Sequence, residues 1–125
     1  MRTGNLTLVF AYLRLSNEEA HSSESASIAN QRQIIQNYCH HYGLTLVREF
    51  VDDGFSGGNF DRPAFQEMLQ QLKAGKANMV ITKDLSRLGR DMREASYYAE
   101  QFFPERGIRY LTIADNFDNS HENVM

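Results

Sequence analysis

The feature that most limits the fold of this chain is the alternation of short apolar segments with amphipathic helical segments. Periodicity predicts strands and helices in turn: strands at residues 6–13, 44–51, 79–82 and 108–113, and helices at residues 28–42, between Asp61 and Gly75, and at 92–103. Such alternation implies right-handed crossovers between parallel strands. We therefore expect a three-layer α/β fold, in which a mostly parallel, four- to five-stranded sheet carries helices on both faces.

Residue types at the ends of the expected helices refine this prediction. Ser27 is a favourable N-cap for the first helix, and Gly43 supplies its stop. Asp61 is the cap candidate for the second helix, since Pro63 is tolerated in a first helical turn.

Side-chain periodicity predicts which positions are buried. In the second strand, Leu44, Leu46 and Phe50 are expected on one side of the sheet. In the first helix the apolar face consists of Ile28, Ile35, Tyr38, Cys39 and Tyr42. In the last helix the residues expected in the core are Met92, Ala95, Ala99, Phe102 and Phe103. The tail at residues 114–125 is polar and carries no strong signal.

Composition narrows the class of protein. The chain has 125 residues, enough for one domain, and its hydrophobic content of 42% argues against disorder. No stretch reaches the length of a membrane span, and the first apolar run lacks the cleavage site of a secretory signal. Cys39 is the only cysteine, which excludes an internal disulfide, and a cytoplasmic location is the default expectation. The net charge of −3 argues against a domain whose main task is gripping DNA.

Four arginines are expected to converge at one edge of the sheet. Sites in parallel α/β folds lie beyond the carboxyl ends of the strands, which selects residues 14–27, 52–62 and 83–90. These segments contribute Arg14, Arg62, Arg87 and Arg90, and the first also carries Ser16. Guanidinium groups can bind a phosphodiester, stabilise a five-coordinate phosphorus and lower the pKa of a serine hydroxyl. The pattern therefore favours phosphoryl transfer with arginines in the role of a metal.

The same residues also have ordinary structural interpretations. Ser16 can simply begin a solvated turn, and Asp53 and Ser56 can be turn-forming residues in a glycine-rich loop. A helical turn would place Arg87 and Arg90 on the same side.

Arg87 and Arg90 could then form a solvated basic face whose partners are Asp84 and Asp91. The four histidines give no metal-ligand set, because His40 and His41 point to different faces of a helix, while His21 and His121 lack partners at ligand spacing. We therefore expect no metal and no cofactor.

Three motifs together resemble those of the serine site-specific recombinases, the resolvase and invertase family. Residues 12–16 (YLRLS) resemble its nucleophile motif, residues 53–57 (DGFSG) with 61–63 (DRP) resemble its second motif, and residues 86–90 (SRLGR) resemble its third. They occur in the family's order, and the resemblance implies a resolvase-like catalytic domain.

The resemblance implies a role for each matched position. Ser16 would attack the scissile DNA phosphate, form a 5′-phosphoserine bond and release a 3′-hydroxyl, without ATP. Arg14, Arg87 and Arg90 would hold the phosphate and activate Ser16, and one of them would protonate the leaving oxygen. Arg62 would contact the phosphate from the side.

Further residues would surround that phosphate. Asp53 would orient the arginines. The remaining positions expected to contact DNA or line the site are Tyr12, Gln31, Ser56, Lys83 and Ser86. In the family, four subunits cut both duplexes, half of the complex rotates, and the reversed attack reseals the strands.

One position departs from the small resolvases, which carry an aspartate where this chain has Ser86. A serine cannot supply the negative charge that would orient Arg87. Ser86, the Ser-rich stretch before Gln31 and residues 102–104 are more similar to the large serine recombinases, which include transposon excision proteins and phage-type integrases.

The resemblance also predicts the domain organisation. Residues 1–118 would form the catalytic domain, and residues 119–125 would begin the long oligomerisation helix, with the DNA-binding domains absent from this chain. The full-length protein would bind double-stranded DNA as a homodimer or tetramer, whereas this chain alone is expected to be a monomer or weak dimer with no membrane partner. If other domains of the full-length protein make most of the contacts with DNA, a net charge of −3 in this domain is explained.

Two other classes of protein stay open. A serine-dependent hydrolase would need a general base such as histidine beside Ser16. A non-catalytic regulatory or protein-interaction module with the same fold would need neither Ser16 nor the arginines, so the presence of both weighs against it.

Overall fold

The sheet is the central layer of the structure, which is a computed structural model. It describes residues 7–16, 27–55, 62–89 and 91–120, with the backbone alone for residues 16, 54 and 55. The four strands are β1 (Leu8–Ser16), β2 (Thr45–Phe55), β3 (Met79–Thr82) and β4 (Arg109–Thr112). They lie in the order β2-β1-β3-β4, and every neighbouring pair is parallel.

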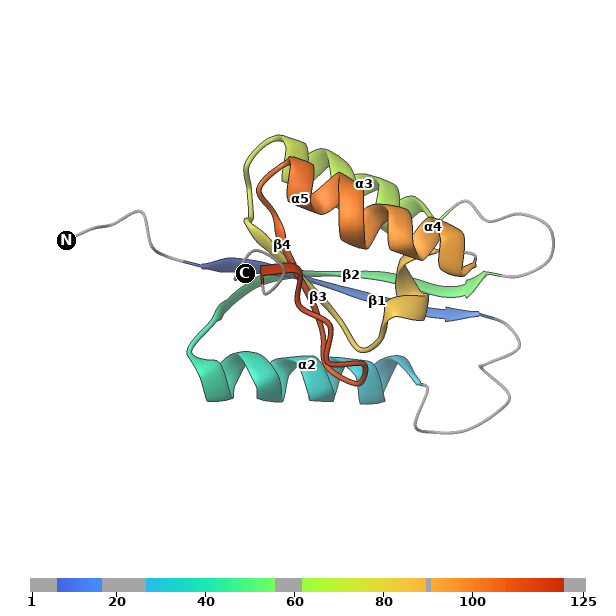
Figure 1. The fold of residues 1–125 in the computed structure, drawn as a ribbon. Helices are drawn as coiled ribbons and strands as arrows, with labels where there is room; N and C mark the ends of the chain where they lie inside the picture. The colour runs from blue at the N-terminus through green and yellow to red at the C-terminus, as the bar shows by residue number, and fades with distance from the viewer. Residues whose placement is uncertain (1–6, 17–26, 56–61, 90, 121–125) are drawn as a thin grey trace.

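Helices cover both faces of this sheet. Their bounds are α2 (Ile28–Tyr42), α3 (Pro63–Lys73), the 3₁₀ helix η3 (Leu85–Leu88), α4 (Met92–Tyr97), the π-helical turn η4 (Tyr98–Phe102) and α5 (Phe103–Glu105). Figure 1 shows α2 on one face and α3, α4 and α5 on the other. The expected three-layer fold with a parallel sheet is confirmed.

The central strand β1 divides the core into two halves. Val9, Ala11 and Leu13 pack in the cluster that includes Ile35 of α2. The alternate residues, Phe10 and Tyr12 among them, join the cluster on the face of α3 and α4. Because both faces of β1 are covered, its sequence is a continuous apolar run.

The ends of α2 confirm the expected caps. The Ser27 hydroxyl accepts a hydrogen bond from the Asn30 N–H at 3.0 Å. Gly43 adopts the left-handed conformation at φ 68°, which a glycine reaches without steric cost. The apolar face is narrower than expected, however, because Tyr42 in the last turn is 60% exposed.

Strands β1 and β2 are longer than predicted, which changes where the site residues lie. The two strands stay paired beyond their apolar runs, with Arg14 opposite Asp52 and Leu15 opposite Asp53. The predicted strand ends at residues 13 and 51 are therefore wrong. Backbone pairing with a neighbouring strand holds these polar residues in extended conformation, and periodicity does not detect such pairing.

Phe50 of β2 is buried, but the prediction that it shares a face of the sheet with Leu44 and Leu46 is wrong. Val9 pairs with Leu46 but Phe10 pairs with Arg48, so an extra residue forms a bulge in β2 between them. One inserted residue moves every later side chain to the opposite face. Leu46 consequently packs on the α2 side, while Phe50 meets Phe10 on the other side, with ring centroids 4.9 Å apart.

The last predicted helix is interrupted and begins with an exposed residue. The α-helical turns of α4 give way to the π-helical turn η4 before α5 completes the segment. Ala95, Ala99, Phe102 and Phe103 are buried as expected, but Met92 is 58% exposed. Gly89 approaches the Ala95 N–H and Glu94 so closely that an added Cβ would lie 2.6 Å from the Ala95 nitrogen. Gly89 thus packs against the first turns of α4, whereas Met92, the first residue of α4, is exposed.

The polar tail covers the open edge of β4. Leu111 forms an antiparallel bridge with Asp118, and the Thr112 N–H donates to the Phe117 carbonyl at 2.9 Å. The Asn119 amide completes the edge, since its oxygen accepts from the Tyr110 N–H and its nitrogen donates to the Ile108 carbonyl, both at 3.1 Å. Asn119 therefore substitutes for a neighbouring strand at an otherwise unpaired edge.

We expect Asn119→Ala to lower the free energy of unfolding by about 1–3 kcal/mol, because two buried backbone groups would lose their partners. The measurement is denaturant unfolding followed by circular dichroism. Ser120→Ala is the matched control, since the exposed Ser120 hydroxyl bonds only the side chain of Asp118 among the described residues. Equal stability of the two variants would contradict the assigned role of Asn119.

Candidate active site at the carboxyl edge of the sheet

Three of the four predicted arginines meet at the 3₁₀ helix η3, which follows β3. Arg14 donates from Nε to the Arg87 carbonyl at 3.2 Å and from Nη2 to the Ser86 carbonyl at 2.7 Å. Arg62 donates to the same Arg87 carbonyl at 3.4 Å. Arg14, Arg62 and Arg87 are called the arginine cluster below. The cluster lies at the carboxyl edge of the sheet, where the strand order predicts a site.

Arg87 is held from two sides, although its side chain is only 4% exposed. Its Nη1 donates to the Arg14 carbonyl on β1 at 3.0 Å. Its Nε and Nη2 lie 3.3 and 3.4 Å from the two carboxylate oxygens of Asp84. A buried guanidinium needs such partners, because desolvating an unpaired charge costs several kcal/mol.

Arg62 is the most enclosed member of the cluster, with a side chain 2% exposed. Its guanidinium lies 3.8 Å from the ring centroid of Phe65 and 4.0 Å from the Glu94 carboxylate. Its backbone adopts φ 47° in the position before α3, a conformation that residues other than glycine and asparagine rarely take. Strain of this kind persists only where surrounding contacts impose it, and it concentrates at functional sites.

Asp52 fixes the start of α3 and was missed by the sequence analysis. Its carboxylate accepts from the N–H groups of Ala64 and Phe65 at 2.9 and 3.0 Å, and from the Tyr12 hydroxyl at 2.8 Å. Asp61, the predicted cap, lies outside the described residues. A carboxylate from β2 thus anchors the helix that begins directly after Arg62.

Tyr12 links this anchor to the arginine cluster. Burial raises the pKa of Tyr12 well above its ordinary range, the charge of Arg62 opposes the rise, and the Asp52 carboxylate reinforces it. The hydroxyl therefore stays protonated and donates to Asp52. The ring of Tyr12 also faces Arg62, whose guanidinium carbon is 5.9 Å from the ring centroid.

Gln31 of α2 holds the backbone of β1 beside the cluster. Its amide oxygen accepts from the Arg14 N–H at 3.2 Å, and its amide nitrogen donates to the Arg14 carbonyl at 3.0 Å. Among the described residues, the pairing of β1 with β3 ends at Ala11, three positions before Arg14. The fully buried Gln31 bonds the backbone at Arg14 and so orients the first arginine of the cluster.

The other predicted residues differ in how the structure describes them. Asp53 is exposed near the end of β2, and Lys83 is half-buried directly after β3. Ser86 is exposed and donates from its hydroxyl to Asp84 at 2.6 Å. Ser16 is the last residue of β1, two positions beyond Arg14. The side chain of Ser16, together with Ser56 and Arg90, lies outside the described residues.

One prediction about the third segment needs correction. The helical turn assumed for Arg87 and Arg90 ends at Leu88, since Gly89 is extended at φ −150°. Asp84, named from the sequence as a possible partner of Arg87, supplies the negative charge that Ser86 cannot. The 3₁₀ turn brings Asp84 and Arg87 together, three residues apart in the chain.

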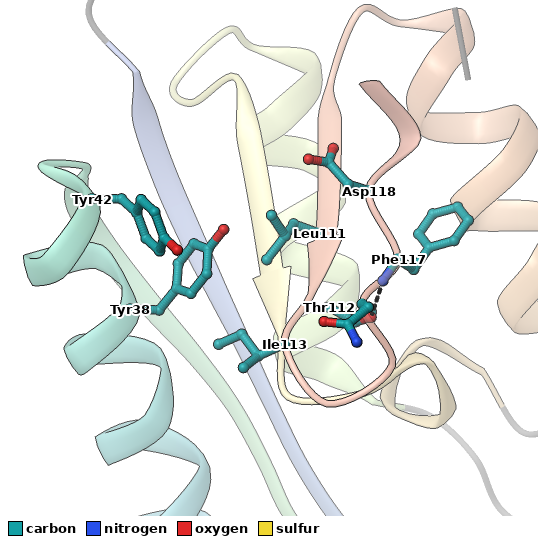
Figure 2. A pocket seen from close by; sticks show the side chains of 8 residues that line it. Tyr38, Tyr42, Leu111, Thr112, Ile113, Phe117 and Asp118 are labelled. Atoms are coloured by element: carbon teal, nitrogen blue, oxygen red, sulfur yellow. Dashed lines mark hydrogen bonds between the residues drawn. The ribbon is translucent and has the colours of Figure 1, made fainter. Parts of the chain in front are cut away.

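A separate pocket lies on the α2 side of β4. Figure 2 shows Tyr38 and Tyr42 of α2 facing Leu111 and Ile113, with Asp118 at the rim. Burial would raise the pKa of Asp118, but hydrogen bonds from Arg109 and Ser120 outweigh it and lower that pKa. Since this carboxylate is 2.7 Å from Arg109, the pocket lacks the concentration of positive charge found around η3.

Two further observations concern the described part of the chain. In it, no group of three or more His, Cys, Asp or Glu side chains is arranged to hold a metal ion. Within the same residues, no helix is both long enough and apolar enough to cross a membrane.

The cluster is suited to an anion with several acceptor oxygens. The guanidinium groups of Arg14 and Arg62 donate to carbonyl oxygens of η3, and that of Arg87 donates to the Arg14 carbonyl. Phosphate oxygens are stronger acceptors than carbonyl oxygens because they carry charge. Fold and site together define a parallel α/β protein with a candidate phosphate-binding edge. Residues 9–124 match the family described as "Resolvase, N terminal domain", and the chain belongs to this family.

Similar proteins agree with this assignment. A putative DNA recombinase of Bacillus subtilis (strain 168) is 26% identical over 118 residues, which are 94% of this chain and 23% of that protein. The transposon Tn917 resolvase of Enterococcus faecalis is 27% identical over 114 residues, 90% of this chain and 53% of that protein. The chain thus spans about half or less of the length of these relatives.

A solved structure confirms the fold. The N-terminal catalytic domain of TP901-1 integrase superposes with a TM-score of 0.78 at 25% sequence identity, covering 91% of this chain and 82% of that domain. The resemblance drawn from the three motifs and the predicted fold class are both confirmed.

The adjacent carboxylates Asp52 and Asp53 give a matched test of the anchor. We expect Asp52→Asn to lower the free energy of unfolding by about 1–3 kcal/mol, because three hydrogen bonds, two of them buried, lose a charged acceptor. The exposed Asp53, changed to Asn, should alter it by about 0.5 kcal/mol or less. Thermal and denaturant unfolding measure both variants, and a larger effect at Asp53 would refute the assignment.

Proposed function

We propose that this chain is the catalytic domain of a site-specific DNA recombinase and that Ser16 is its nucleophile. The arginine cluster around η3 is the observation that carries the proposal. It concentrates buried positive charge at the carboxyl edge of the sheet in a protein whose net charge is −3. Ser16 ends the strand that carries Arg14.

The proposed reaction is a transesterification. The Ser16 oxygen bonds to phosphorus and gives up its proton, while the bond to the 3′ oxygen breaks and that oxygen is protonated. The products are a 5′-phosphoserine and a 3′-hydroxyl. Attack by a 3′-hydroxyl on the phosphoserine reverses the step, so no ATP is consumed. In this proposal the arginines take the role that a metal ion would otherwise have.

The arginines stabilise the negative charge on the phosphate oxygens in the transition state. Arg14, Arg87 and Arg90 contact the phosphate and activate Ser16, with one of them as the general acid, and Arg62 contacts the phosphate from the side. Preorganised donors of this kind contribute most to catalysis where burial excludes water. Two members, Arg62 and Arg87, are already buried and oriented.

Other positions complete the proposed site. Asp53 orients arginines. Tyr12, Gln31, Ser56, Lys83 and Ser86 line the site or position its members. The hydrogen bonds of Tyr12 to Asp52 and of Gln31 to the Arg14 backbone support positioning roles for these two.

Assembly and DNA recognition belong to a longer protein in this proposal. The curated relatives named above are a putative DNA recombinase and a transposon resolvase, and both are longer than this chain. We assign sequence-specific DNA binding to regions outside these 125 residues, and strand exchange to a tetramer of the whole protein. The similarity to TP901-1 integrase favours the large serine recombinase branch.

Trapping of a covalent adduct tests the nucleophile. We expect the whole protein, incubated with nicked DNA that carries its recombination site, to form a protein–DNA adduct resolved by denaturing electrophoresis. Ser16→Ala should abolish the adduct, and Ser120→Ala, at an exposed position, should leave it intact. An adduct that persists in Ser16→Ala would identify a different nucleophile, and a protein that forms none would favour the non-catalytic alternative.

A charge-conserving substitution tests the phosphate contact of Arg87. Arg87→Lys keeps the positive charge but loses the planar fork of donors. We expect adduct formation to slow about 100- to 1000-fold, as when one oriented transition-state donor is removed. Arg93→Lys on the exposed side of α4 is the control. Equal rates for both variants would be incompatible with the proposed role.

A further inference from the structure

Asp84 is the acidic residue in closest contact with Arg87. Its two carboxylate oxygens lie 3.3 and 3.4 Å from Nε and Nη2 of Arg87. The same carboxylate accepts from the Ser86 N–H at 3.1 Å and from the Ser86 hydroxyl at 2.6 Å. The Asp84 side chain therefore caps the N-terminus of η3 and also pairs with the buried guanidinium of Arg87 in the same helix.

We propose that Asp84 is a positioning residue that orients the Arg87 guanidinium toward the phosphate, with Ser86 orienting Asp84 in turn. This inference rests on the proposed function for its effect on DNA cleavage. In this proposal Asp84, two positions before Ser86, supplies the negative charge that orients Arg87. Ser86 contributes indirectly, by donating hydrogen bonds to the Asp84 carboxylate.

The cap alone does not account for an aspartate at this position. Serine, threonine and asparagine cap helices about as well as aspartate, because a single acceptor oxygen suffices. Both oxygens of Asp84 lie within ion-pair distance of Arg87, and one of them accepts a hydrogen bond from Nη2, so the carboxylate holds the guanidinium by its charge as well as by this bond. A neutral side chain would fulfil the cap and lose the ion pair.

Asp84 is itself anchored in the core of the sheet. Its backbone carbonyl accepts from the Thr82 hydroxyl at 2.8 Å, and Thr82 shares a second hydrogen bond with the buried Tyr110 hydroxyl at 2.6 Å. Thr82 and Tyr110 belong to the adjacent strands β3 and β4. The carboxylate therefore projects from a point with little freedom to move, as a positioning residue requires.

The isosteric variant Asp84→Asn separates charge from cap. The asparagine oxygen still accepts from the Ser86 N–H, but the ion pair with Arg87 is lost. Asp115→Asn is the matched control, because Asp115 also holds η3 through the Leu85 N–H at 2.7 Å and is exposed. Both changes remove one negative charge beside the same helical turn.

Two readouts are measured on these variants. The first is single-turnover adduct formation by the whole protein at saturating DNA, together with DNA affinity. We expect Asp84→Asn to slow adduct formation about 10- to 100-fold, the range for loss of one hydrogen-bonded charge, with affinity changed less than about threefold. Asp115→Asn should react about as fast as the unmodified protein.

The second readout needs no DNA cleavage. Hydrogen exchange of the Arg87 Nη2–H groups, which donate to Asp84, should accelerate in Asp84→Asn and stay slow in Asp115→Asn when followed by NMR. Unchanged exchange in Asp84→Asn, or equal effects of the two variants on exchange or rate, would overturn the positioning role. If the unmodified protein forms no adduct, the proposed function fails, and the exchange measurement still decides whether Asp84 holds Arg87.

Discussion

The burial of two guanidinium groups at one edge of the sheet is the constraint on which the site depends. Arg62 and Arg87 are almost fully enclosed, and such groups are tolerated only where charged and polar partners replace water. The partners are carbonyl oxygens of η3 and β1 together with two carboxylates, Asp84 and Glu94. The 3₁₀ turn, the end of β1 and the start of α3 are consequently held against one another.

Two aspartates convert the ends of strands into rigid supports for these arginines. Asp52, on β2, holds the first turn of α3 and so the residue before it, Arg62. Asp84 follows β3 and holds Arg87. The parallel topology brings both strand ends to the same edge, so residues distant in the chain share one site. A phosphate placed there would meet donors already oriented, which is the physical basis of the proposed recombinase chemistry.

Local periodicity predicted the fold well where a pattern depends on neighbouring residues alone. The cap at Ser27, the stop at Gly43 and strand β3 agree with the structure. Periodicity failed where a distant contact decides the outcome. The bulge in β2 arises from its pairing with β1 and moves Phe50 to the opposite face. Met92, the first residue of α4, is exposed although periodicity grouped it with the buried Ala95 and Ala99.

The sequence by itself determined the α/β class, the order of its elements and the identity of the arginines, because strand and helix periods and motif spacing are local properties of the chain. Only the tertiary structure decided which groups hold those arginines. The Asp52 carboxylate accepts hydrogen bonds from two residues that follow it by 12 and 13 positions in the chain. Arg14 donates to backbone carbonyls more than 70 positions away. Such contacts follow from how strands and helices pack, which no local pattern encodes, and so the role of Asp52 emerged only in three dimensions. Asp84, three residues before Arg87, was already a possible partner in the sequence.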